Sequence, residues 1–323
     1  MSGAPILDVK HLKKHFPVRR GLLQRTVAEI KAVDGVSFAL AAGETLCLVG
    51  ESGCGKSTVG RLILRLIDPT SGDIVFKGES ITSLSREAMR DKRQRLQIVF
   101  QDPYASLNPR LTAGTIVAEP LENFDRLGRA EREGRVRELL ARVGLGADAL
   151  SKYPFEFSGG QRQRLGIARA LALSPSLIVA DEPVSALDVS VQAQVLNLMM
   201  DLQEELGLAY LFISHDLGVV EHMADRVAVM YLGRIVEIGQ KEEVFARPRH
   251  PYTRALISAA PLPNPDAKRE RIVLEGDVPS PMTPPSGCHF HTRCPFAVPR
   301  CRAEYPELRG EAGSHRFACH LDL

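Results

Sequence analysis

Long apolar runs are missing from this chain of 323 residues. No stretch of 18 or more consecutive apolar residues occurs, so the sequence predicts no transmembrane helix. Residues 1–5 lack the basic and then apolar layout of a secretion signal, and we therefore expect the protein to stay in the cytosol. Any role at a membrane is expected to be peripheral.

An excess of charge of one sign is also missing. The chain has 41 Lys and Arg against 39 Asp and Glu, so no global basic field points to a nucleic-acid partner. An apolar fraction of 44% and a charged fraction of 25% are ordinary for a globular protein. At this length we expect a substantial core and more than one domain.

Strand and helix patterns alternate along most of the chain. Short apolar runs predict strands at residues 32–40, 44–49, 96–101, 177–180, 210–213 and 227–230. Helical periodicity predicts helices over residues 118–127, 129–143 and 190–206. Strand signals nearly vanish between residues 102 and 175. The order predicts an α/β protein with a mostly parallel sheet, covered on both faces, and a helical insert.

The run GESGCGKS at residues 50–57 carries the strongest chemical signal. It fits G-x-x-x-x-G-K-[ST] and lies between an apolar strand and a helix predicted over residues 59–67. Glycines let the backbone amides turn around an anion, and the helix start adds its positive dipole end. Lys56 is expected to reach the β- and γ-phosphates and Ser57 to bind Mg²⁺. The alternative is a glycine-rich turn that carries a chance lysine. The residues expected to hold the nucleotide are Gly50, Glu51, Ser52, Gly53, Cys54, Gly55, Lys56, Ser57 and Thr58.

Two adjacent acids, Asp181 and Glu182, end the strand predicted at residues 177–180. Neighbouring residues on a strand point to opposite faces, so the two acids serve different tasks. In a phosphate-loop ATPase the first completes the Mg²⁺ shell and the second polarises the attacking water. The alternative is a strand that ends in solvated acids.

Ser158, Gly159, Gly160 and Gln161 open a further predicted helix, residues 165–173, and form a second helix start suited to an anion. One chain does not need two such starts for one γ-phosphate. The second start therefore predicts a nucleotide that is held by another subunit.

With these motifs in order, residues 6–260 resemble the nucleotide-binding subunits of ABC transporters. Residues 158–161 match the family signature, with Phe157 where leucine is commoner. Asp188 matches the dimer-interface loop, here residues 185–188, and His215 matches the switch histidine. Gln101 matches the glutamine that links the γ-phosphate site to the membrane partner. Phe16 lies where the family stacks an aromatic ring on adenine. Phe16 can equally be a core aromatic.

The resemblance implies an ABC ATPase cassette over residues 1–260, with a RecA-like core, an antiparallel β subdomain and an inserted helical subdomain at about residues 102–175. It implies that ATP lies between the phosphate loop of one subunit and the signature of another. Glu182 is then the general base and His215 holds the γ-phosphate and water, with Lys56 and Gln101 completing the catalytic set. Mg²⁺ is then held by Ser57, Gln101 and Asp181.

Finer matches resemble the bacterial dipeptide and oligopeptide importers, most closely their second type of ATPase subunit. These matches lie at residues 99–110, 182–190 and 249–253 and in the tail. The implied partners are a homologous second ATPase in a heterodimer, two transmembrane permeases and, indirectly, a periplasmic or lipid-anchored peptide-binding protein. The implied location is the cytoplasmic face of the bacterial inner membrane. Nickel or glutathione as cargo, and a soluble ABC ATPase that acts on nucleic acid, remain alternatives.

Residues 261–323 form a proline-rich linker and a cysteine-bearing extension. Seven prolines between residues 261 and 285 predict a stiff linker. Four cysteines follow with the spacing C-x5-C-x6-C-x17-C, at Cys288, Cys294, Cys301 and Cys319. Because cytosolic thiols stay reduced, four of them in a short segment predict a metal site, either zinc or iron–sulfur. The resemblance implies a [4Fe–4S] cluster; zinc and free thiols remain alternatives.

Overall fold

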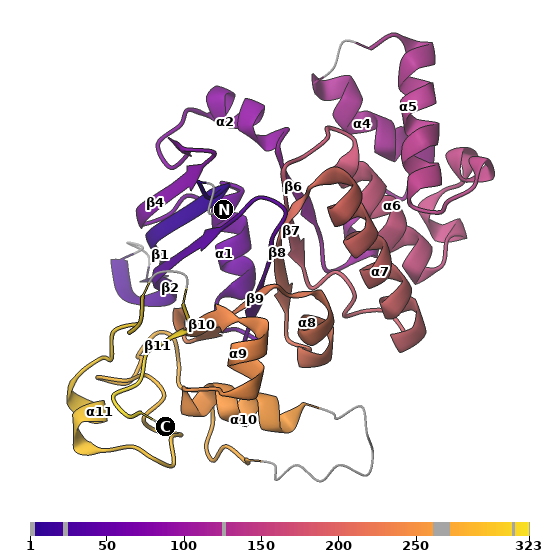
Figure 1. Ribbon diagram of the computed structural model, residues 1–323. Coiled ribbons are helices and arrows are strands. Elements are labelled where there is room, and N and C mark those ends of the chain that lie inside the picture. Colours follow the sequence, from indigo (N-terminus) through magenta and orange to yellow (C-terminus); the bar gives the residue numbers. More distant parts are fainter. Residues whose placement is uncertain (1–3, 22–24, 125–126, 261–271, 312–313, 323) are drawn as a thin grey trace. The chain divides into compact units, whose positions relative to one another are not determined.

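The computed structural model describes residues 4–21, 25–124, 127–260, 272–311 and 314–322 (Figure 1). The chain forms two compact units. The first contains residues 1–40, 45–82 and 214–323, and the second contains residues 41–44 and 83–213. Among the described residues, no helix combines the length and the apolar character needed to cross a membrane.

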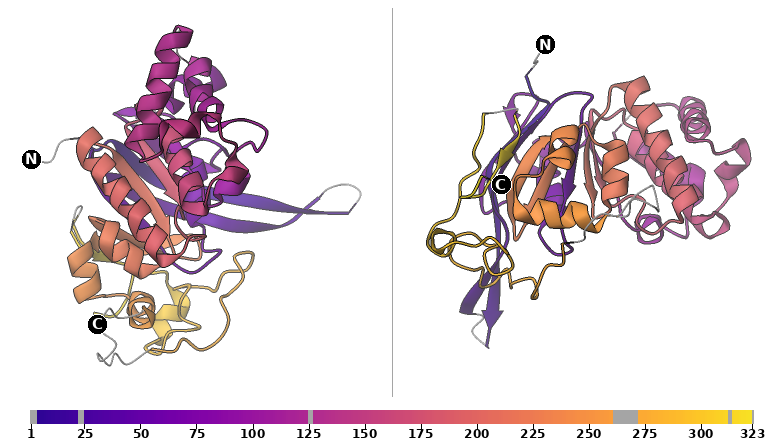
Figure 2. Two further views of the ribbon diagram at one scale, coloured as in Figure 1. Left: turned by 90° about the vertical axis from the view of Figure 1, so that its right-hand side faces the viewer. Right: turned by 60° about the horizontal axis from the view of Figure 1, so that its bottom comes forward.

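An antiparallel sheet makes up one part of the first unit. Its strands are, in spatial order, β2 (Arg25–Leu40), β1 (Leu7–Arg20), β4 (Ser71–Phe76) and β5 (Glu79–Ser80). The two long strands pair from Leu7 opposite Leu40 to Arg20 opposite Arg25 and form a long ribbon (Figure 2). Val36, Phe38 and Leu40 alternate with less buried residues, so one face of β2 packs on the core. This sheet confirms the predicted antiparallel β subdomain.

The same unit holds the strands that position the phosphate loop. In spatial order they are β11 (Arg316–Phe317), β10 (Arg234–Gln240), β9 (Arg226–Tyr231) and β3 (Thr45–Val49). β3 and β9 are parallel, whereas β10 is antiparallel to both of its neighbours. All five residues of β3 are buried, as its apolar sequence requires. The helices of this unit are α1 (Lys56–Ile63), α8 (Leu217–Met223), α9 (Lys241–Ala246), α10 (Pro251–Ala259) and α11 (Pro299–Ala303).

The described carboxy-terminal segment packs against other parts of the first unit. Residues Glu237 and Ile238 of β10 pair with β11, and the Lys31 amide donates to the Pro281 carbonyl oxygen (3.1 Å). Phe290 is buried against the rings of Tyr231 and Tyr252. The predicted proline-rich linker lies partly outside the described residues, because these omit 261–271. The segment that follows is held by both backbone and side-chain contacts.

The second unit combines parallel strands with helices. Its strands, in spatial order, are β8 (Ala209–Ser214), β7 (Leu177–Asp181) and β6 (Leu96–Val99). They pair in parallel, as predicted, and their residues are mostly apolar and buried. The helices are α2 (Arg86–Arg93), α3 (Pro103–Ser106), α4 (Ala113–Phe124), α5 (Arg129–Arg142), α6 (Gly159–Leu171) and α7 (Val189–Leu206), with short 3₁₀ turns η1 (Ala147–Ser151) and η2 (Pro154–Glu156).

Helix ends differ from the predictions at three places. The helix predicted from residue 118 begins at Ala113 and ends at Phe124, and residues 125–126 of the predicted span lie outside the described residues. The helix predicted through residue 67 ends at Ile63. α6 begins at Gly159 rather than Leu165, because the Ser158 side chain caps it there. Between residues 102 and 175 the described chain contains helices and turns but no strand, so the helical insert is confirmed.

Candidate functional site

The phosphate loop connects β3 to α1 in the first unit. Gly50 and Gly55 have backbone φ angles of 150° and 108°, which residues other than glycine rarely adopt. A Cβ atom would lie 2.3 Å from the Met230 carbonyl oxygen at Gly50 and 2.1 Å from the Ala32 carbonyl oxygen at Gly55. Both positions therefore require glycine, and the loop backbone lies directly against β9 and β2.

Lys56 is the first residue of α1 and is buried. Its Nζ donates to the carbonyl oxygens of Gly50 (2.7 Å) and Glu51 (3.0 Å), so the ammonium lies within the phosphate loop. Ser57 and Thr58 follow in the first helical turn and are half-buried. Gly55, at the N-cap, has no side chain, so no side-chain hydrogen bond caps the start of α1.

Cys54 and Glu51 are the other loop residues with side chains of interest. Cys54 is buried, which raises the pKa of its thiol, so it acts as a small apolar residue. Glu51 contacts two residues far away in sequence. Its amide donates to the Tyr252 hydroxyl (2.8 Å), and its carboxylate accepts two hydrogen bonds from the Arg293 guanidinium (2.8 and 3.1 Å).

Phe16 and His215 lie in the same unit as the phosphate loop. Phe16 lies on β1 opposite Ile30, and 36% of its surface is exposed, so it is not a core aromatic. The Lys14 ammonium lies 5.0 Å from the centre of its ring. His215 is exposed and precedes α8, whose start is capped by the Asp216 carboxylate.

Gln101, Asp181 and Glu182 lie in the second unit, and the structure brings two of them into contact. Asp181 is the buried last residue of β7, and Glu182 follows with a φ of 47°, which is rare for a residue other than glycine. The side-chain amide of Gln101 donates to the Glu182 carboxylate (3.0 Å). The two adjacent acids therefore have different surroundings, and their different tasks stay a prediction.

The predicted signature forms the start of α6 in the second unit. The Ser158 hydroxyl accepts from the Gln161 amide (3.3 Å), and the Gln161 side chain accepts from the Ser158 amide (3.0 Å), which is a capping box. A Cβ atom on Gly160 would lie 2.3 Å from the Val191 side chain of α7, so the two helices pack closely here. Asp188 is exposed at the N-cap position of α7.

The four tail cysteines lie near one another in the first unit. The Cys288 amide donates to the Cys301 carbonyl oxygen (2.8 Å), and all six cysteines of the described chain are free thiols. Burial, together with the charges of the other three tail thiols, raises the pKa of Cys288 to about 12. No group of three or more His, Cys, Asp or Glu side chains among the described residues is placed to hold a metal ion. The structure therefore does not support the predicted metal site.

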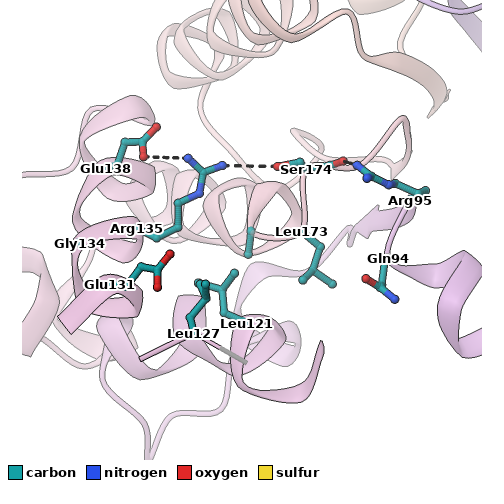
Figure 3. Close-up of a pocket in the computed structure, with 11 residues that line it drawn as sticks. Gln94, Arg95, Leu121, Leu127, Glu131, Gly134, Arg135, Glu138, Leu173 and Ser174 are labelled. Carbon is teal, nitrogen blue, oxygen red and sulfur yellow. Dashed lines mark hydrogen bonds and ion pairs between the residues drawn. The ribbon is translucent and has the colours of Figure 1, made fainter. Parts of the chain in front are cut away.

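A separate pocket of about 520 Å³ lies in the helical part of the second unit (Figure 3). Arg135 extends toward Glu138 and Ser174, and Arg95 donates to the Ser174 carbonyl oxygen. The pocket is lined by Gln94, Arg95, Leu121, Leu127, Glu131, Gly134, Arg135, Glu138, Ala172, Leu173 and Ser174. None of these residues was predicted to bind the nucleotide.

Sequence reasoning missed Arg293 and the contact of Tyr252 with the loop. Arg293 is 242 residues from Glu51, so no local pattern could reveal the pair. One signal was present: a carboxylate inside a phosphate-binding loop requires compensation of its charge. That signal predicts a cation nearby but not which one.

Two family models match the chain. The model described as "ABC transporter" matches residues 33–185, and the model described as "Oligopeptide/dipeptide transporter, C-terminal region" matches residues 236–301.

Several curated proteins are similar over almost the whole chain. "Probable peptide ABC transporter ATP-binding protein y4tS" of Sinorhizobium fredii is 60% identical over 99% of this chain and 91% of its own length. "Oligopeptide transport ATP-binding protein AppF" of Bacillus subtilis is 59% identical over 98% of this chain and 97% of its own length. "Dipeptide transport ATP-binding protein DppF" of Haemophilus influenzae is 53% identical over 99% and 98%, respectively.

Solved structures share the fold over about three quarters of the chain. The post-hydrolysis dimer of the ATP-binding cassette MJ0796, bound to ADP and Pi, matches with a TM-score of 0.65 and 29% identity, over 73% of this chain and 98% of that chain. cbiO1 of Clostridium perfringens, part of the transporter complex cbiONQ, matches with a TM-score of 0.66 and 30% identity, over 76% and 92%.

Proposed function

Because the chain belongs to the ATP-binding subunits of the ABC transporter family, we propose that it hydrolyses ATP to energise the import of dipeptides or oligopeptides. The observation that carries the ATPase part is the phosphate loop, in which Lys56 lies buried among carbonyl oxygens at a helix start without a side-chain cap. The match of residues 236–301 to the peptide-transporter C-terminal region supports the cargo.

The phosphate loop, residues 50–58, binds the triphosphate in this proposal. Amides at the start of α1 and the Lys56 ammonium contact the β- and γ-phosphates. Phe16 is exposed on β1, which supports its proposed stacking on adenine. Mg²⁺ would be held by Ser57, Gln101 and Asp181, whose hydroxyl, amide and carboxylate oxygens suit a hard cation, and it would neutralise phosphate charge when bound.

Hydrolysis is assigned to residues that follow β7 and β8. Glu182 is the proposed general base for the attacking water, and its hydrogen bond from Gln101 supports a link between the base and the loop after β6. His215 is proposed to hold the γ-phosphate and the water. Ser158, Gly159, Gly160, Gln161 and Asp188 are proposed to act on a nucleotide held by a second subunit.

The proposed partners follow from that shared site. They are a homologous second ATPase in a heterodimer, two transmembrane permeases and, indirectly, a peptide-binding protein, with this chain at the cytoplasmic face of the bacterial inner membrane. The division into a cassette of residues 1–260 and an extension of residues 261–323 stays a prediction.

The four tail cysteines are proposed to hold a [4Fe–4S] cluster. Each thiolate of such a cluster binds a different iron, so the four sulfurs need not converge on one ion, as they must for zinc. Four free thiols in one segment are the donor set that such a cluster requires. Iron and sulfide contents and absorbance near 400 nm in anaerobically purified protein test it; a colourless protein with stoichiometric zinc would refute it.

A substitution of the proposed base tests the ATPase assignment. Glu182→Gln keeps the shape and the contact with Gln101, so MgATP binding should persist while turnover in the assembled transporter falls by at least about a hundredfold. Glu204→Gln, at an exposed position on α7, is the matched control and should leave turnover unchanged. Near-normal turnover of Glu182→Gln would contradict the assignment.

A further inference from the structure

The acidic residue of the phosphate loop creates an electrostatic problem. Glu51 is the second residue of a loop that is proposed to bind a triphosphate, and a carboxylate there repels the phosphate charge. The side chain of Glu51 is 28% exposed, so solvent screens its charge only in part. A cation that pairs with this carboxylate therefore favours nucleotide binding.

Arg293 supplies that cation. Its two terminal guanidinium nitrogens donate to the two carboxylate oxygens of Glu51, at 2.8 and 3.1 Å, and only 7% of its side chain is exposed. Two-point contacts of this kind fix orientation as well as charge. The pair is therefore a charged clamp rather than a surface contact.

The clamp is anchored in the tail. Arg293 lies between Cys288 and Cys294, close to Phe290, which is buried against Tyr252 at a ring distance of 5.4 Å. The Tyr252 hydroxyl in turn accepts from the Glu51 amide (2.8 Å). Both the side chain and the backbone of Glu51 are thus attached to one buried group, which α10 and the tail build together.

Glu51 also contacts the lysine of the site. Its carbonyl oxygen accepts from the Lys56 ammonium at 3.0 Å. A shift of Glu51 therefore moves a carbonyl oxygen that holds Lys56. Arg293 reaches the phosphate-binding group through one intermediate residue.

We infer that Arg293 is a positioning residue for the phosphate loop, which neutralises Glu51 and so makes nucleotide affinity depend on the cysteine-bearing tail. This inference rests on the proposed function, namely that the loop of residues 50–58 binds ATP. It extends the ATP site to a residue of the tail, 242 positions away from the residue that it holds.

Steady-state ATPase kinetics of the assembled transporter with Arg293→Met test the inference. Methionine keeps an unbranched apolar stem and removes the charge, so the unpaired carboxylate should raise the KM for ATP about tenfold, or about 1.4 kcal/mol, with kcat nearly unchanged. Adding Glu51→Gln removes the repelling charge, so the double variant should return the KM to within about threefold of the wild-type value. A purely structural role for Arg293 predicts no such rescue.

A matched control and a separate variant complete the design. Arg300→Met breaks an exposed pair with Glu304 in the same tail and should leave the KM unchanged. Unchanged KM in Arg293→Met, or a raised KM that Glu51→Gln does not rescue, would overturn the inference. Lys56→Ala distinguishes a failure of the proposed ATP site from a failure of the inference about Arg293. Wild-type ATP affinity in Lys56→Ala would contradict the ATP site itself. Lost ATP affinity in Lys56→Ala, together with an unchanged KM in Arg293→Met, would contradict only the role of Arg293.

Discussion

Two helix starts on this chain are suited to anions, and they are built in opposite ways. α1 begins after Gly55, which has no side chain and therefore gives the helix no side-chain cap. At the start of α6 the side chains of Ser158 and Gln161 form caps instead. Each accepts a hydrogen bond from the backbone amide of the other residue. The difference teaches that one start is prepared to bind phosphate directly. The other start is capped by its own side chains, and its proposed role is to meet a nucleotide held by another subunit.

The largest expected effect comes from closing the α1 start. In Gly55→Ala the new Cβ would lie 2.1 Å from the Ala32 carbonyl oxygen at a φ of 108°, so MgATP affinity should fall on the order of a hundredfold or more. Titration of the purified chain with MgATP measures this. Gly78→Ala is the control, because its φ is 80° and no atom lies within 4 Å of the new Cβ. Equal affinities in the two variants would remove the special status of the α1 start.

A third helix start, that of α10, should lose its cap with acid. Nδ1 of the buried His250 accepts from the Tyr252 amide, and burial lowers the pKa of His250 from 6.5 to about 4. The unfolded chain therefore takes up this proton below pH 6.5, whereas the folded chain does so only near pH 4. Stability is thus lost as the pH falls through this window, by up to about 3 kcal/mol.

Chemical denaturation at several pH values between 4 and 6.5 measures that loss. His250→Asn keeps an N-cap acceptor and removes the titrating ring, so the pH slope of the unfolding free energy should become shallower. The slope decides the outcome, because the smaller side chain also lowers stability at every pH. An unchanged slope would contradict the assignment to His250.

The smallest expected effect comes from opening the α6 start. Ser158→Ala removes the cap and should lower the free energy of unfolding by about 1 kcal/mol. Ser85→Ala removes the same kind of cap from α2, where the hydroxyl accepts from the Ala88 amide, and should cost about the same. ATP turnover of the assembled transporter should fall only in Ser158→Ala. Equal turnover in both variants would reduce Ser158 to a structural cap.

Local motifs made much of the fold predictable, including the position of the phosphate loop between a strand and a helix. The phosphate loop, the strand that ends in Asp181 and the helical insert each depend on residues close together in sequence. β10 was not predicted, because Glu237 interrupts its apolar pattern. That acid is nevertheless fully buried, where it accepts from the amides of Arg249 and His250 and contacts His315.

Long-range contacts set the limit of the sequence predictions. The hydrogen bond from Gln101 to Glu182 and the pair of Arg293 with Glu51 join residues that no local pattern relates. The tail was predicted as a linker and a metal segment, and its packing against the rest of the first unit has no periodic signal. A charge inside the phosphate loop was the one local clue to that packing.

MgATP affinity of the isolated full-length chain, measured by calorimetric titration, tests the comparison of the two helix starts most directly. The account predicts that Ser158→Ala binds MgATP as tightly as the wild-type chain, whereas Gly55→Ala loses binding by on the order of a hundredfold. A loss of affinity in Ser158→Ala as large as that in Gly55→Ala would contradict the account, because both helix starts would then serve the nucleotide of their own chain.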